Sequence, residues 1–66
     1  MDIIVNGEAR SVPERTTAAG LIDILELGGR RLALELNGEI VPRSEHAGCP
    51  LSAGDEIEIV HAVGGG

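Results

Sequence analysis

The sequence ends in "IVHAVGGG", so three consecutive glycines, Gly64, Gly65 and Gly66, follow a β-branched extended run. Glycine loses more backbone entropy on ordering than any other residue, so folding alone gives no reason to place three of them together. We expect the last glycine to carry a free α-carboxylate. We therefore expect a flexible tail over residues 64–66 that follows a single folded unit over residues 1–63.

Cys49 is the only thiol of the chain, and it stands three residues after His46. An H-x-x-C pair can belong to a metal site, but a closed structural zinc site needs four protein ligands. Only His61 remains as a third nitrogen or sulfur ligand, so no metal is expected. Cys49 could serve as a persulfide relay or as an acyl-disulfide partner of the tail. A free cysteine is more often a small buried hydrophobe, and that structural interpretation is preferred.

The segment "DEIEIVHAV" alternates between apolar and polar residues with the period of a β-strand. Glu56 and Glu58 then share one face, and without an enclosing pocket they are solvated carboxylates, not an acid–base pair. They could meet basic residues of a partner, with help from Glu35 or Glu39. An exposed apolar patch beside them would complete a docking surface near the tail. The residues predicted for this partner surface are Ile4, Val60, Ala62, Glu56 and Glu58.

The chain has 66 residues and a formal net charge of −6, with eleven acidic residues against five arginines and no lysine. Phe, Tyr and Trp are also absent. Nucleic-acid binding needs cationic surface, and single-strand binding adds stacking rings, so no nucleic-acid partner is expected. The acidic balance favours docking on a basic patch of a protein partner.

Sixty-six residues are expected to form one small domain that buries about 60% of its unfolded surface. No pocket of the roughly 300 Å³ that small-molecule sites need is expected, so neither an enzyme nor a resident cofactor is predicted. No apolar run approaches the ~18 residues of a membrane span. Met1 is followed by Asp2 and no basic signal segment appears. The single cysteine fits a reducing compartment, so we expect a cytoplasmic protein that is a monomer when free.

Two Asn-Gly pairs indicate the turns that organise the strands. In "MDIIVNGEARSV" an apolar run is followed by Asn6-Gly7 and a second extended run, which is typical of a two-residue hairpin. Alternation places Ile3 and Val5 on one face and Ile4 on the other. "RLALELNGEIVPR" repeats the pattern around Asn37-Gly38.

The segment "TTAAGLIDILELGG" between the hairpins has helical spacing. Thr16 or Thr17 can cap the helix by accepting a hydrogen bond from a free backbone amide. Gly28-Gly29 is expected to supply the left-handed residue that ends it, which gives a helix of about 11 residues. The apolar positions that recur at i, i+3, i+4 and i+7 are Ala18, Leu21, Ile22 and Leu25.

The polar connection "SEHAGCPLSAGD" precedes the last strand, with a short helical turn around residues 44–47 and Leu51 as its core anchor. The predicted order is strand, strand, helix, strand, strand, strand. The connection through the helix must cross over, so one central strand pair should be parallel. This is an α+β fold, the β-grasp (ubiquitin-like) roll, with a mixed four- to five-stranded sheet packed on one helix.

The chain as a whole resembles the ThiS family of sulfur-carrier proteins, which supply sulfur for the thiazole ring of thiamine. The residues that carry the resemblance are "NGE", "TT" before the helix, "ELNGEIVPRSEHAGCPLSAGDEIEIV" and the final Gly-Gly. "LNGEIVPRSE" is the specific part, since "GD-x-[IV]-E-[IV]" is shared more widely among ubiquitin-like carriers. His46 departs from the family, because an aromatic residue, often Trp, is common there. The chain also ends in three glycines instead of two, which leaves the pair Gly65-Gly66 in place.

The resemblance implies that an ATP-dependent, ubiquitin-activating-type enzyme adenylates the Gly66 carboxylate. Sulfur from a donor protein such as a cysteine desulfurase then replaces one oxygen to give a thiocarboxylate, and thiazole synthase receives the sulfur. The same fold and tail would suit a molybdopterin-type sulfur carrier, although such chains are usually longer and lack "NGEIVPRSE". They would also suit a ubiquitin-like protein modifier, or a plain β-grasp interaction module whose glycines are inert.

Overall fold

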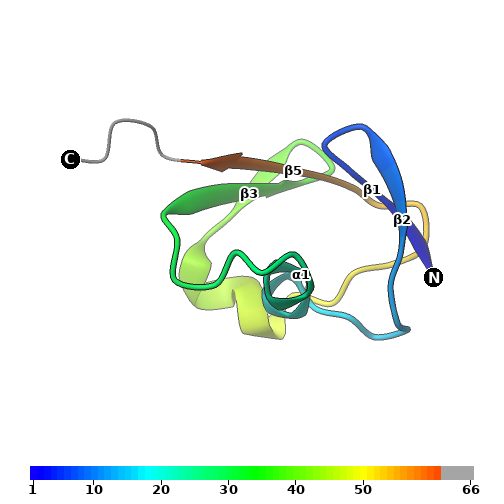
Figure 1. The fold of residues 1–66 in the computed structure, drawn as a ribbon, viewed down its shortest axis with the longest axis horizontal. Coiled ribbons are helices and arrows are strands. Elements are labelled where there is room, and N and C mark those ends of the chain that lie inside the picture. Colours follow the sequence, from blue (N-terminus) through cyan, green and yellow to red (C-terminus); the bar gives the residue numbers. More distant parts are fainter. Residues whose placement is uncertain (62–66) are drawn as a thin grey trace.

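The computed structural model describes residues 1–61, and these form a five-stranded mixed sheet with one α-helix beneath it (Figure 1). The strand order across the sheet is β2-β1-β5-β3-β4. The elements in chain order are β1 (Asp2–Val5), β2 (Glu8–Ser11), α1 (Ala18–Ile24), β3 (Leu32–Leu36), β4 (Glu39–Val41), the 3-10 helix η1 (Arg43–Gly48) and β5 (Glu56–His61).

Both predicted hairpins are present. Asn6 and Gly7 have φ angles of 50° and 83°, and Asn37 and Gly38 have φ angles of 50° and 87°. A two-residue turn with positive φ at both positions matches the right-handed twist of the strands that it joins, which explains the two Asn-Gly pairs. In the first hairpin, Ile3 pairs with Arg10 and Val5 pairs with Glu8.

The central strands confirm the predicted topology. β1 runs parallel to β5, with Ile4 opposite Glu56, while β3 pairs antiparallel with β5 from Leu32 opposite His61 to Leu36 opposite Ile57. The two strands of the parallel pair lie at opposite ends of the chain, and α1 belongs to the connection between the two hairpins. The fold is therefore the β-grasp roll expected from the sequence.

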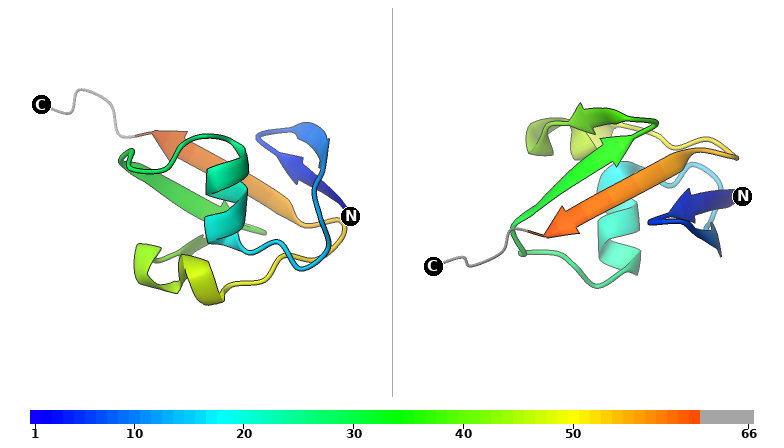
Figure 2. Two further views of the ribbon diagram at one scale, coloured as in Figure 1. Left: turned by 60° about the horizontal axis from the view of Figure 1, so that its bottom comes forward. Right: turned by 90° about the horizontal axis from the view of Figure 1, so that it is seen from above.

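The core lies between α1 and one face of the sheet (Figure 2). Leu21 on α1 and Leu34 on β3 are fully buried, and the predicted anchor Leu51 is buried beside them. Partly buried residues from the α1–β3 segment, including Leu27, pack against this cluster. The buried apolar residues are Ile3, Val5, Val12, Ala18, Leu21, Leu34, Leu51, Ile57 and Ile59.

The helix begins as predicted at a threonine cap. Thr17 has an extended backbone, and its Oγ1 accepts a hydrogen bond of 3.0 Å from the Gly20 amide. This bond satisfies one of the amides that a helix leaves without a partner in its first turn. The predicted helical turn around residues 44–47 is also present, as the 3-10 helix η1.

The predicted helix end was wrong. α1 has seven residues and ends at Ile24, and the left-handed residue after it is Glu26, with a φ of 58°. The Glu26 amide bonds to the Asp23 carbonyl at 3.0 Å, and the Leu27 amide bonds to the Ile22 carbonyl at 2.9 Å. These two bonds form a Schellman motif, which turns the chain early enough to bring Leu27 onto the core.

Glu26→Gly is expected to stabilise the fold by about 0.5–1 kcal/mol, because glycine occupies the left-handed region without the steric penalty of a Cβ atom. Urea unfolding of the wild type and the variant measures this gain. Glu26→Ala is the matched control, because it removes the same charge but keeps the Cβ atom. Equal midpoints for the glycine and alanine variants would contradict the assignment of Glu26 to the left-handed capping position.

Candidate functional site

β5 leads directly into the predicted tail. Its last described residue, His61, is exposed and lies opposite Leu32 of β3. The predicted tail residues Gly64, Gly65 and Gly66, and also Ala62 of the predicted partner surface, lie outside the described residues. The boundary between a domain over residues 1–63 and a tail over residues 64–66 therefore stays a prediction.

The sheet face opposite α1 is open to solvent, and β5 places Glu56, Glu58 and Val60 on it. Val60 is 52% exposed, and both glutamates are exposed. Ile4 lies beside Glu56 through the β1–β5 register and is half-buried. The structure thus brings together on one face all the described residues of the predicted partner surface, which we call the open face.

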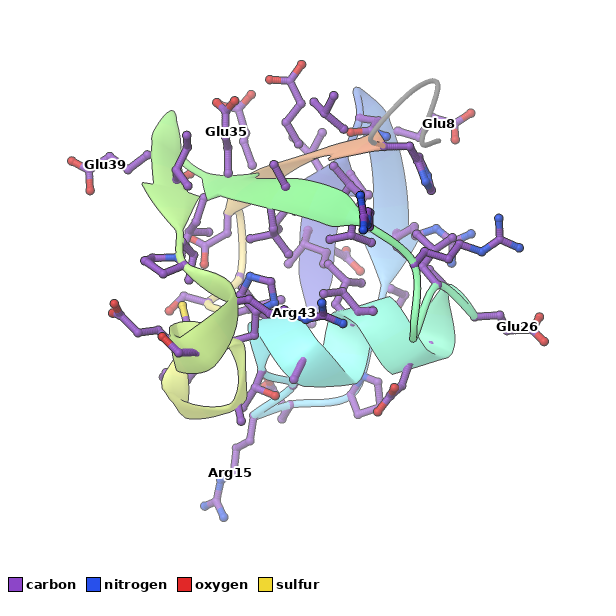
Figure 3. The ribbon with its side chains drawn as sticks, turned by 90° about the vertical axis from the view of Figure 1, so that its left-hand side faces the viewer. Glu8, Arg15, Glu26, Glu35, Glu39 and Arg43 are labelled. Carbon is purple, nitrogen blue, oxygen red and sulfur yellow. The ribbon has the colours of Figure 1, made fainter. Side chains whose placement is uncertain are left out.

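The neighbouring strands extend the open face beyond the residues predicted for it. Glu35 of β3 lies directly opposite Glu58, and Ile40 of β4 lies directly opposite Glu35. Ile40 is 69% exposed, and Figure 3 shows Glu35 pointing away from α1. Sequence analysis missed Ile40. Successive side chains of the segment "EIV" must point to opposite faces of the sheet, but three residues are too few to show which face of an edge strand is buried.

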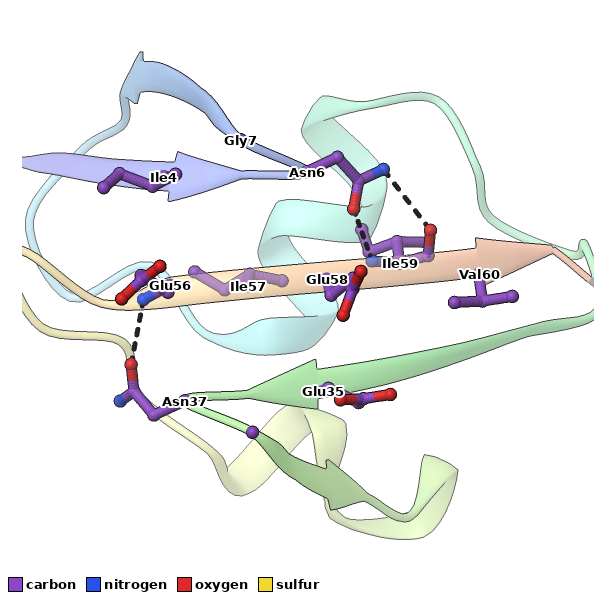
Figure 4. Close-up of a pocket in the computed structure, with 11 residues that line it drawn as sticks. Ile4, Asn6, Gly7, Glu35, Asn37, Glu56, Ile57, Glu58, Ile59 and Val60 are labelled. Carbon is purple, nitrogen blue, oxygen red and sulfur yellow. Dashed lines mark hydrogen bonds between the residues drawn. The ribbon is translucent and has the colours of Figure 1, made fainter.

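A groove of about 640 Å³ runs over the open face (Figure 4). The two asparagine turns lie beside it, and its lining includes Ile4, Glu35, Glu56, Glu58 and Val60. This volume exceeds the roughly 300 Å³ that small-molecule sites need, so the expectation that the domain has no pocket of that size was wrong. The groove exists because residues 1–61 contain one α-helix, and that helix covers only the other face of the sheet.

The two turn asparagines hold β5 in register with their side chains. The β1–β5 ladder stops at Val5 opposite Ile57, and beyond it Asn6 Oδ1 accepts a 2.8 Å bond from the Ile59 amide. Asn6 Nδ2 donates to the Ile59 carbonyl at 3.3 Å. On the other side, Asn37 Oδ1 accepts a 2.9 Å bond from the Glu56 amide (Figure 4). Sequence analysis assigned these asparagines only to the turns, since the cross-strand bonds depend on register.

Cys49 and His46 have structural roles in the described part of the chain. Cys49 is half-buried against the core, and its carbonyl accepts a 2.9 Å hydrogen bond from the Ala18 amide. His46 is buried, and its Nε2 bonds to the Val41 carbonyl at 2.9 Å. Among residues 1–61, no group of three or more His, Cys, Asp or Glu side chains is placed to hold a metal ion. Within the same residues, no helix is long and apolar enough to cross a membrane.

Solved structures of thiamine biosynthesis proteins have the same architecture. The crystal structure of ThiS from Geobacter metallireducens matches with a TM-score of 0.86 and 29% sequence identity, and the match covers 100% of both chains. The solution structure of a thiamine biosynthesis protein from the same organism has a TM-score of 0.82, also at 29% identity. That match covers 100% of this chain and 88% of the other.

Sequence relatives include two thiazole synthases. The chain is 39% identical over 66 residues to thiazole synthase of Paramagnetospirillum magneticum and 36% identical over 66 residues to that of Magnetococcus marinus. Each match takes in the whole of this chain but only 20% of the relative, so the chain spans about a fifth of the length of these curated proteins.

The ThiS family model matches residues 3–66, which includes the three final glycines. This match runs from β1 through the last residue of the sequence, and the solved ThiS structure has the same sheet and helix over its whole length. The chain belongs to the ThiS family, whose members are sulfur carriers of thiamine biosynthesis.

Proposed function

We propose that this chain is a sulfur-carrying cosubstrate, not an enzyme, and that Gly66 carries the sulfur as a thiocarboxylate for the thiazole ring of thiamine. The observation that supports this most is the family match through residue 66, which joins the β-grasp domain to the glycine tail. β5 is the last described element, and residues 62–66 follow it in the sequence.

The chemistry starts at the Gly66 carboxylate, whose oxygen is a poor leaving group. Attack of this carboxylate on the α-phosphorus of ATP releases pyrophosphate and gives an acyl adenylate. Hydrosulfide then attacks the acyl carbon, the bond from that carbon to the AMP oxygen breaks, and a thiocarboxylate remains. No oxidant or reductant is needed when the sulfur arrives as sulfide. An adenylating enzyme of the ubiquitin-activating type performs the first step.

Glycine suits the tail because the carboxylate must reach ATP inside another protein. A residue without a side chain passes a narrow slot and accepts any backbone dihedral. Three extended residues span at most about 10–11 Å, which is enough to hold the carboxylate clear of the sheet. Gly64 and Gly65 act as spacers in this account, and Gly66 is the reacting residue.

The open face is the surface that we assign to the adenylating enzyme. It combines exposed Val60 and half-buried Ile4 with the carboxylates of Glu56 and Glu58. Ala62, which lies outside the described residues, is assigned to the same surface from the sequence alone. A basic surface with an apolar centre complements such a face. The chain's net charge of −6 would also speed the encounter with a basic partner.

Thiazole synthase is the proposed acceptor of the sulfur. The two thiazole synthase relatives contain a segment like this chain within a much longer polypeptide. A segment similar to this chain and a thiazole synthase thus occur in one polypeptide, which supports thiazole synthase as the functional partner of the carrier. A sulfur-donor protein such as a cysteine desulfurase, together with a thiol reductant that releases its persulfide sulfur as hydrosulfide, and a cytoplasmic location complete the proposal.

The family match favours this function over two others that use the same fold. A molybdopterin-type carrier and a ubiquitin-like modifier would use the same adenylated tail with different acceptors. The solved structures that match the full length are thiamine biosynthesis proteins, which supports the thiazole assignment.

Incubation with the adenylating enzyme, ATP and sulfide is expected to raise the intact mass by the difference between one sulfur and one oxygen atom. Mass spectrometry of the whole chain and of its C-terminal peptide measures the change and locates it at Gly66. Reactions without ATP are the control. A ladder of conjugated proteins would point to a modifier, and an unchanged mass with an active enzyme would contradict the carrier function.

Val60→Asp is expected to weaken the complex with the adenylating enzyme by about tenfold or more, because it places a charge in the apolar centre of the open face. Isothermal titration calorimetry measures the affinity. Ile24→Asp is the matched control, since Ile24 is 43% exposed against 52% for Val60 but lies on α1. Equal losses in both variants would show that the open face has no special role.

Glu35→Gln is expected to stabilise the free protein by a few tenths of a kcal/mol and to weaken the complex with the adenylating enzyme. Glu35 and Glu58 lie directly opposite each other, and like charges in this arrangement repel. The gain in urea unfolding should shrink at high salt, because salt screens exposed charges. Glu39→Gln is the control, since Glu39 lies opposite Leu36. A stabilised variant with unchanged affinity for the adenylating enzyme would show that Glu35 does not contribute to the interface.

A further inference from the structure

A second hollow lies on the helix side of the sheet, away from the open face. It has a volume of about 230 Å³ and lies between α1, residues 27–30 and η1. Its lining includes Arg30 and Arg43 together with the buried His46. Both arginines are exposed, and in the view of Figure 3 the Arg43 side chain projects in front of the space between the sheet and α1. The proposed sulfur-carrier function uses none of these residues.

The charge of this pocket is opposite to that of the chain. Two of the five arginines line it, although the chain as a whole has a net charge of −6. Among the described residues that line it, Asp23 is the one acidic side chain, so the arginines leave an excess of positive charge. Guanidinium groups present several fixed N–H donors that match the oxygens of a phosphate or carboxylate.

His46 adds a third polar group. The ring is only 6% exposed, and its Nε2 lies 2.9 Å from the Val41 carbonyl, which can only accept, so Nε2 carries the proton. Nδ1 has no hydrogen-bond partner among the described residues. Every fully buried polar side-chain atom of the described residues has a hydrogen-bond partner. Nδ1 has none, so it must be accessible to solvent. His46 lines the pocket, and in the neutral ring Nδ1 can accept a hydrogen bond from an O–H group of a ligand.

We propose that this pocket binds a phosphate group, with Arg30 and Arg43 on its anionic oxygens and His46 in the lining beside them. The volume is below the roughly 300 Å³ at which pockets for whole small molecules begin, so it suits an isolated phosphate or the phosphate end of a small ester. The site goes beyond the proposed sulfur-carrier function. It lies across the sheet from the surface assigned to the adenylating enzyme, so both can be occupied together.

Titration of the full chain with inorganic phosphate, followed by ¹H–¹⁵N NMR, tests the site. The amides of residues 28–30 and 43–47 are expected to shift and saturate, whereas chloride at equal ionic strength leaves them unchanged. Arg43→Gln and Arg30→Gln should each weaken binding about tenfold or more, because each removes charged hydrogen bonds. Asp23→Asn should tighten binding, because it removes the opposing charge. Arg10→Gln, on β2, is the matched control and should bind as the wild type does.

A parallel titration with glycerol phosphate distinguishes the two sources of the phosphate group. Tighter binding of the ester assigns the site to phosphorylated metabolites, and tighter binding of inorganic phosphate assigns it to the free ion; either result supports the site. The proposal is overturned if chloride reproduces the shifts, or if Arg10→Gln weakens binding as much as Arg43→Gln. It is also overturned if no saturation appears. These outcomes are independent of sulfur loading, which is measured at Gly66.

Discussion

The fold depends on the position of β5 in the centre of the sheet. β1 holds it on one side through parallel pairing, and β3 holds it on the other through antiparallel pairing. Where β1 becomes too short, the Asn6 side chain continues the hydrogen bonding to Ile59. Because the strand period is two, this fixed register sends Ile57 and Ile59 into the core and Glu56 and Glu58 to the surface. A slip of one residue would turn the two carboxylates toward the core and the two isoleucines toward solvent, so this register is strongly favoured.

One α-helix is enough to cover the core, but it leaves one face of the sheet open to solvent. α1 and the segments around it bury a cluster of aliphatic residues without a single aromatic ring. The open face carries the carboxylates of β3 and β5 beside Val60 and Ile40. Arg30 and Arg43 lie on the helix side of the sheet. The open face is therefore acidic, and the pocket on the helix side is lined by two arginines and one aspartate. The acidic open face suits a basic protein partner, and the cationic pocket suits a small oxyanion.

Local chemistry determined what could be predicted from sequence. Each Asn-Gly pair fixes a turn by its own backbone preference, and the Thr17 cap and the alternation in β5 are equally local, so these features were predicted correctly. The end of α1 was not, because the left-handed residue is Glu26 and not a glycine, and the packing of Leu27 on the core that accompanies this early turn is a tertiary contact. Ile40 and the second roles of Asn6 and Asn37 depend on which strands are neighbours. The pocket of Arg30 and Arg43 joins segments that only the tertiary fold brings together.

The central claim is that sulfur travels on the terminal glycine, presented by a folded roll that other proteins load and empty. Single-turnover thiazole formation, with isotope-labelled thiocarboxylate chain as the sole sulfur source, tests it most directly. The account predicts that the label enters the thiazole in proportion to the chain supplied, and that a chain without Gly65 and Gly66 delivers none despite an unchanged fold. Delivery of sulfur by the shortened chain would contradict the account.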